Sequence, residues 1–241
     1  MNRCKHKVWV YAFRFLRVSL SLQLSSKHEI HAALQNVRVI AEIAIKHGDI
    51  AIHVMAAVTE ALIHLHSRDV NSIVDAQRAI ASARAQQLNA IMKDVPQLNV
   101  LVLFLDLVCS LDPYDQKASM PKMQEMQKFL DNESCKAKIS PIEDAFSVPI
   151  EGVSAGSLVL ETGGVFSKSA DGRDSLVFSW LARTDVYALA FLLSGVAVRY
   201  KNHNNRNKTE VFLLEGLKVT DGMLVFLQDY RTLIDGPSRS A

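Results

Sequence analysis

Histidine side chains are the first place to look for chemistry in this sequence of 241 residues. His28 and His31 lie three positions apart, so a helix places them on one face, whereas His64 and His66, two apart, do not share a face. A zinc protease holds its metal with two helical histidines four positions apart, and His28-Glu-Ile-His31 lacks that spacing. We therefore expect these histidines at the surface or near helix ends rather than around a metal.

The three cysteines also give no catalytic or metal-binding pattern. They are far apart in sequence and form no Cys-x-x-Cys pair. Cys109 lies in an apolar stretch, as a small core residue does, and no His-plus-Asn arrangement marks Cys135 as a nucleophile. Three cysteines cannot build a disulfide framework, which favours a reducing compartment.

A glycine-rich passage at 152–173 is the remaining place for an enzyme site. Gly163-Gly164 and the segment 170–174 are not followed by the lysine of a phosphate-binding loop. An enzyme built on this passage requires a pocket with perturbed carboxylates, for instance at Glu161, Asp171 or Asp174. We expect Asp174 instead to cap a helix. The sequence therefore predicts no catalytic residue, no cofactor and no metal.

The elements that must position any functional residue are helices, because apolar residues recur with the helical period along most of the chain. Gly48 is expected to end one helix as its C′ glycine, and Asp49 to cap the next. Glycine (10) and proline (6) are too scarce for an all-β fold with many turns. The helices are expected at about 8–23, 28–46, 50–66, 72–94, 96–111, 120–130, 174–181, 185–200 and 208–219.

Helix starts recur about every 20–25 residues with short connections, which predicts an array of antiparallel helix pairs. Ala76 and Ala83 are seven apart, like the two alanines of a tetratricopeptide second helix. We predict an all-α fold, an α-solenoid of tetratricopeptide-like antiparallel helix pairs with a Gly/Pro-containing loop passage at about 132–173. Its parts are an N-terminal helical-repeat part (8–131), the loop-rich connection (132–173), a C-terminal helical part of the same solenoid (174–234) and a disordered tail (235–241).

Charge is distributed unevenly although the net charge is only +2. Residues 1–46 carry a net charge of +6, and residues 94–161 a net charge of −6. This asymmetry fits nucleic-acid binding or an acidic partner, but the basic residues are dispersed as on an ordinary solvated face. The longest apolar run, Leu98–Leu111, spans about 14 residues and is too short for a membrane helix.

Hydrophobic segments along the chain resemble the cohesin loading factor family in its fungal form. The resemblance covers about residues 8–227, whereas Met1–Lys7 and Asp235–Ala241 depart from the pattern, which indicates a partial or mis-spliced gene model. The segments are Trp9–Leu24, Ala33–Ile40, Gly48-Asp49, Glu60–Leu65, Gln77–Arg84, Gln97-Leu98, Phe104–Leu111 and Asp171–Leu181.

The resemblance implies a non-catalytic, chromatin-associated nuclear scaffold subunit of the cohesin loader. Such a subunit binds the extended N-terminal segment of a large HEAT-repeat loader subunit and supports cohesin loading and sister-chromatid cohesion. Cohesin and chromatin are then indirect partners, with no membrane and no direct nucleic-acid contact. Aromatic and arginine side chains dominate the energy of such interfaces. The expected partner-binding residues are Arg14, Arg17, Arg38, Tyr187 and Phe191.

Three other functions stay open at this point. A helical-repeat adaptor of another nuclear or cytoplasmic complex shares the fold and differs only in its partner. Nucleic-acid binding through the basic N-terminal region predicts an affinity that depends strongly on salt and not on nucleotide sequence. An enzyme that used the passage 152–173 has a defined pocket there.

Overall fold

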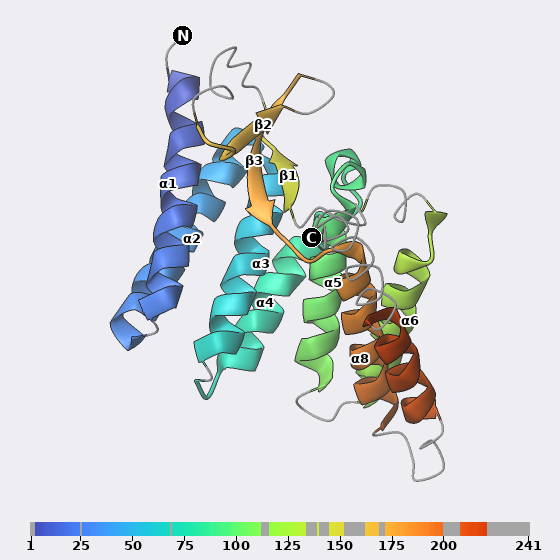
Figure 1. Cartoon of the computed structure of the whole chain (residues 1–241). Coiled ribbons are helices and arrows are strands. Elements are labelled where there is room, and N and C mark those ends of the chain that lie inside the picture. The colour runs from blue at the N-terminus through green and yellow to red at the C-terminus, as the bar shows by residue number, and fades with distance from the viewer. Residues whose placement is uncertain are drawn as a thin grey trace, which may run out of the picture.

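The computed structural model describes residues 3–24, 26–67, 69–111, 116–133, 139, 145–151, 162–168, 172–199 and 208–220. In these ranges the chain is a row of helices with one small sheet laid across one end (Figure 1). The prediction of an all-α, solenoid-like fold is confirmed, since successive helices pack side by side and the sheet is a minor part.

The helices extend over most of the chain. They are α1 (Arg3–Leu24), α2 (Lys27–His47), α3 (Ile50–Ser67), α4 (Ser72–Arg84), α5 (Pro96–Leu111), α6 (Gln116–Leu130) and α8 (Arg183–Arg199). A short 3₁₀ helix, η1 (Ala90–Lys93), precedes α5, and a further helix covers residues 208–220. The strands are β1 (Ala145–Pro149), β2 (Phe166–Lys168) and β3 (Asp174–Ser179).

Local signals account for the ends of α2. The hydroxyl oxygen of Ser26 accepts a hydrogen bond from the backbone N–H of Glu29 at 3.2 Å, which caps the first turn. Gly48 ends the helix with φ of 73°, and its N–H bonds to the carbonyls of Ala44 and Ile45. A left-handed residue is strained for any side chain with a Cβ, so the prediction of a C′ glycine here is confirmed.

One charged residue lies inside the apolar helix α5. Asp106 is 8% exposed, with Arg84 Nη1 of α4 at 2.8 Å and Lys122 Nζ of α6 at 2.6 Å. A buried carboxylate is tolerated only when it is paired. These two ion pairs therefore also fix α4 and α6 on either side of α5.

The expected helix at 174–181 is wrong. Residues Asp174–Ser179 form β3, the middle strand of an antiparallel sheet of order β1-β3-β2. Asp174 does not cap a helix but lies fully buried at the start of this strand. The apolar run Leu176–Phe178 is too short for its period to separate strand from helix, and pairing with β1 decides the outcome. The passage at 132–173 likewise contains β1 and β2.

The helix expected at 72–94 is interrupted. α4 ends at Arg84, and η1 begins at Ala90 after a series of turns. The side chain of Asn89 accepts a hydrogen bond from the N–H of Ile91 at 3.2 Å and starts η1. Leu88, between α4 and η1, is 97% exposed. The apolar residues therefore keep the helical period from α4 into η1, although the backbone leaves the helix after Arg84 and Asn89 starts a new helical turn.

Aromatic contacts hold the sheet against α1. The Trp9 ring lies edge-on to Phe166 with 5.2 Å between centroids, and Phe15 lies edge-on to Phe178 at 4.9 Å. Such edge-to-face pairs stabilise more than their buried area alone provides. The sheet is therefore part of the core around α1 to α5 rather than a separate unit.

The helix α3 is long and apolar enough, by length and composition, to cross a membrane. It packs against α2 on one side and α4 on the other, and 56% of this 18-residue stretch is buried. This is the pattern of a core helix.

Candidate functional site

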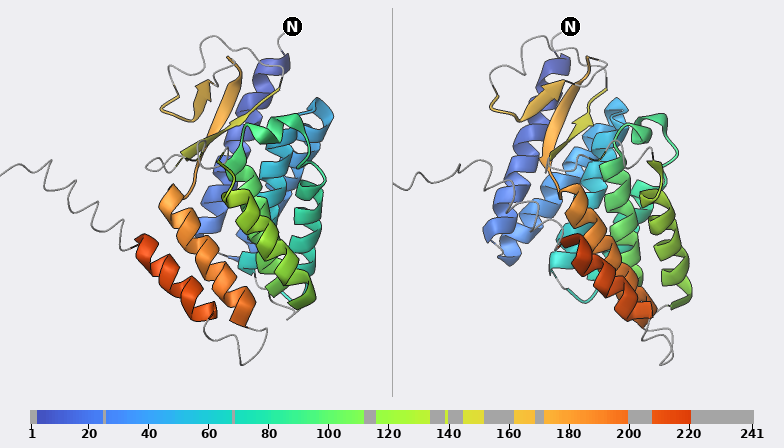
Figure 2. Two further views of the ribbon diagram at one scale, coloured as in Figure 1. Left: turned by 90° about the vertical axis from the view of Figure 1, so that its right-hand side faces the viewer. Right: turned by 45° about the vertical axis from the view of Figure 1, so that its right-hand side comes forward.

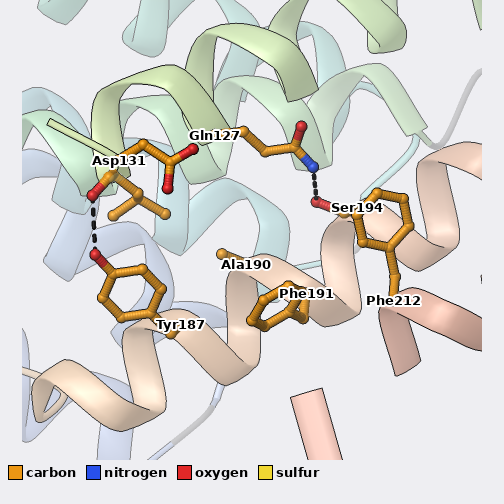
Figure 3. Close-up of a pocket in the computed structure, with 8 residues that line it drawn as sticks. Gln127, Asp131, Tyr187, Ala190, Phe191, Ser194 and Phe212 are labelled. Atoms are coloured by element: carbon orange, nitrogen blue, oxygen red, sulfur yellow. Dashed lines mark hydrogen bonds between the residues drawn. The ribbon is translucent and has the colours of Figure 1, made fainter. Parts of the chain in front are cut away.

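An apolar groove lies between α6, α8 and helix 208–220 (Figure 3). Tyr187 and Phe191, one turn apart on α8, both line it, so the structure brings these two predicted residues together. Its volume is about 260 Å³. The lining residues are Gln127, Leu130, Asp131, Tyr187, Ala190, Phe191, Ser194 and Phe212.

Two hydrogen bonds join the walls of the groove. The Tyr187 hydroxyl donates to the carbonyl oxygen of Leu130 at 2.8 Å, and the Gln127 amide donates to the Ser194 hydroxyl at 3.0 Å (Figure 3). Both bonds connect α6 to α8, so the Tyr187 ring and the face of α8 that carries Phe191 are held in place before any ligand arrives. A groove with fixed walls loses little conformational entropy on binding.

Glycine at two helix positions lets helix 208–220 approach α8 closely. A Cβ at Gly216 would lie 3.2 Å from the Cβ of Phe191, and one at Gly195 would lie 3.3 Å from a methyl group of Leu213. Both distances are shorter than ordinary side-chain contacts. These glycines therefore set how near helix 208–220 lies to Phe191, and with it the width of the groove.

The three predicted arginines belong to another part of the row. Arg14 Nη1 donates to the Asn36 side-chain oxygen at 2.8 Å. Arg17 on α1 pairs with Glu29 at 3.0 Å, and Arg38 on α2 pairs with Glu60 at 2.8 Å. These contacts join α1 to α2 and α2 to α3, so each arginine also stabilises neighbouring helices.

The five predicted residues therefore form two sets rather than one site. The arginines lie on α1 and α2 at one end of the row, and Tyr187 and Phe191 lie on α8 at the other end (Figures 1 and 2). Sequence reasoning missed Gln127, Ser194 and Phe212. No local signal marks them, because Gln127 and Ser194 are 67 positions apart and meet only through helix packing.

A comparison with protein families shows to which family the chain is related. The cohesin loading factor family matches residues 1–238. The chain belongs to the cohesin loading factor family. No curated protein and no solved structure matches it closely enough for comparison. Family membership supports a role in cohesin loading.

The family match also corrects one expectation about the chain. It includes residues 1–7 and 235–238, so the idea that the first segment departs from the family pattern is wrong, and the second departs only from residue 239 on. The structure agrees at the first of them, because Lys7 belongs to α1 and its ammonium group is buried in the core.

The residues considered for chemistry are scattered over the fold of this family member. Within the described ranges, no group of three His, Cys, Asp or Glu side chains could hold a metal ion. Cys109 is buried in the core as predicted, and Asp174 is buried in β3. Cys135, Glu161 and Asp171 lie outside the described residues.

Proposed function

We propose that this chain is a non-catalytic scaffold of the cohesin-loading machinery. In this proposal it binds the extended N-terminal segment of a large HEAT-repeat loader subunit in the nucleus. It thereby supports cohesin loading onto chromatin and sister-chromatid cohesion. The observation that carries the proposal is the preformed groove between α6, α8 and helix 208–220, in a chain of the cohesin loading factor family.

The chemistry of the groove suits recognition of a peptide side chain. Phe191, Ala190 and Phe212 provide apolar surface, and Gln127 and Asp131 provide polar groups beside it. A volume of about 260 Å³ accommodates one large apolar side chain of an extended segment. Aromatic residues in such pockets contribute most of the binding energy of an interface, whereas the surrounding contacts exclude water.

The arginines at the other end of the row serve as a second set of contacts for the same partner. Arg17 and Arg38 expose about half of their side chains, 48% and 55%, despite their ion pairs. Exposed charges of this kind change association rates and specificity more than affinity. An extended segment that reached both ends of the row would be held by apolar contacts at α8 and steered by charge at α1 and α2.

The main alternative is a helical-repeat adaptor with a partner in another complex. Both hypotheses use the groove in the same way and are separated only by the identity of the bound segment. Binding, rather than catalysis, is favoured because the groove is lined mainly by apolar and uncharged side chains.

Isothermal titration of the full chain with the N-terminal segment of the large HEAT-repeat subunit tests the proposal. We expect Phe191→Ala to weaken binding about tenfold or more, because it removes an aromatic anchor. Leu192→Ala is the matched control, since Leu192 is the next residue on α8, is 49% exposed and does not line the groove. Circular dichroism shows whether both variants stay folded.

The possible results separate the two hypotheses. Tight binding that Phe191→Ala weakens and Leu192→Ala leaves unchanged supports the proposal. A folded wild-type chain that does not bind the loader segment overturns the partner assignment in favour of another adaptor function. Binding that is unaffected by Phe191→Ala removes the groove as the site.

A further inference from the structure

The outward face of α1 carries a line of large apolar side chains. Phe13, Leu16, Leu20 and Leu24 are 61%, 55%, 45% and 66% exposed, and these four residues are called the outer stripe. The opposite face of the same helix is buried against α2 and the sheet. Contiguous exposed apolar surface of this kind marks interaction sites on soluble proteins.

The position of α1 in the row indicates which kind of element would cover the outer stripe. Among the described elements, α2 to α6 each pack against helices on two sides, whereas α1 packs against one helix, α2 (Figure 1). A helix that is hydrophobic all round is typically buried between two neighbours. The face of α1 that points away from α2 is therefore suited to one more helix.

The spacing within the outer stripe also favours a helical partner. The residues follow one another in steps of three, four and four, close to the repeat of a coiled-coil seam. The stripe runs for about 16 Å along α1, which a partner helix of three to four turns matches. A shallow hollow of about 440 Å³ at its N-terminal end offers a socket for one large side chain. Its lining residues are Trp9, Val10, Phe13, Arg14 and Asn36.

Charge beside the outer stripe favours an acidic partner. The α1 sequence contains basic residues and no Asp or Glu. Arg14 and Arg17 each follow a stripe residue by one position, so both lie along the same flank of the stripe. Arg14 bonds to the neutral amide of Asn36, which leaves its charge uncompensated by that contact, whereas Arg17 pairs with Glu29.

We propose that the outer stripe of α1 docks an acidic amphipathic helix of a partner protein, which extends the helix row by one element. A second copy of the chain fits poorly, because two α1 helices bring only basic residues together in either orientation. This surface lies on a different helix from the groove at α8, and the inference goes beyond the proposed function and does not depend on the groove. It shares with that function only Arg14 and Arg17, which lie beside the outer stripe.

Fluorescence anisotropy with two synthetic helical peptides tests this inference on the full chain. Both peptides carry leucines at a and d positions over four turns; one has Glu at the flanking e and g positions, and the other has Lys there. We expect the Glu peptide to bind at least about tenfold more tightly than the Lys peptide, and less tightly as salt rises. Analytical ultracentrifugation of the chain alone measures self-association.

Variants locate the binding surface. Leu16→Gln combined with Leu20→Gln should weaken binding of the Glu peptide about tenfold or more, because each leucine loses apolar burial in the complex. Both positions are exposed, so the variant should fold. Leu88→Gln, at a position 97% exposed between α4 and η1, is the matched control and should bind as the wild type does.

Four results would overturn the inference. They are equal binding of the two peptides, no binding of either, binding that the Leu16 and Leu20 changes leave intact, and a dimer of the chain that those changes abolish. The last result would assign the outer stripe to a second copy. One result supports the inference: the Glu peptide binds in a salt-sensitive way, and the Leu16 and Leu20 variant loses this binding while Leu88→Gln keeps it.

Discussion

The ammonium group of Lys7 lies 2.9 Å from Oδ2 of Asp49, and both side chains are buried, at 8% and 0% exposed. The Tyr11 hydroxyl donates to the same carboxylate at 2.8 Å, and the backbone N–H of Glu151 donates to its Oδ1 at 2.8 Å. Lys7 also donates to the carbonyl oxygen of Glu151 at 2.7 Å. One carboxylate thus joins α1, the turn between α2 and α3, and the end of β1.

Lys7→Met should destabilise the chain strongly. Removing one partner of a buried pair leaves an uncompensated charge, which costs about 3–5 kcal/mol. Urea denaturation measures the change in the free energy of unfolding. Arg78→Met is the matched control, because Arg78 is 74% exposed in its pair with Asp75 and such pairs contribute about 0–1 kcal/mol. Equal effects of the two substitutions would contradict the central role of the buried pair.

Acidification should destabilise the fold through His53. Burial lowers the pKa of His53 below its ordinary value of 6.5, partly opposed by the Ala41 carbonyl. The unfolded chain therefore takes up the proton first, so stability falls as the pH drops from 7 through 6.5 to the folded pKa. His53→Gln removes the titration but can still bond to Ser82, which lies 3.1 Å from the ring nitrogen.

Urea denaturation at pH 7.5 and pH 5.5 checks this expectation. The loss of unfolding free energy between the two values should be smaller for His53→Gln than for the wild type. Identical losses would show that other groups carry the acid sensitivity.

Replacing Arg14 and Arg17 together with Glu should weaken capture of the loader segment and of the acidic peptide. Reversal changes two positive charges beside the outer stripe to negative ones, and at position 17 it replaces an ion pair with Glu29 by repulsion between two carboxylates. We expect a several-fold loss that shrinks at high salt, because exposed charges are screened. A pull-down titration measures it, with Lys218→Glu as a control on helix 208–220. Unchanged affinity would remove both arginines from the binding surface.

The sequence predicted the local elements best where a signal was both strong and local. Gly48 ends α2 in the conformation expected of it, and α2 and α3 lie within one residue of their predicted bounds. The first helix, predicted from residue 8, begins earlier, at Arg3. The prediction failed at Asp174–Ser179, where a run of three apolar residues carries no distinguishable period and pairing with β1 makes it a strand.

The candidate site could be predicted only in part. Tyr187 and Phe191 share a groove because both lie on one face of α8, which helical spacing alone provides. Gln127, Ser194 and Phe212 come from three different helices, and nothing in their local sequence states that these helices meet. Exposure of the outer stripe on α1 is likewise a matter of which helices lie beside it.

The sequence by itself determined most of the helices and their apolar faces, because hydrophobic period and capping residues act over a few positions. It also carried the resemblance to the family that the comparison shows. The tertiary structure alone decided which buried charges meet. Asp49 was expected to cap α3, and it does precede the helix, where its carbonyl oxygen accepts a bond from the N–H of His53. Its carboxylate instead accepts bonds from Lys7, Tyr11 and Glu151. A buried carboxylate is stable only when charged or hydrogen-bonding groups pair with it. The partners of Asp49 lie 38 to 102 positions away in the sequence, so only tertiary packing brings them to it.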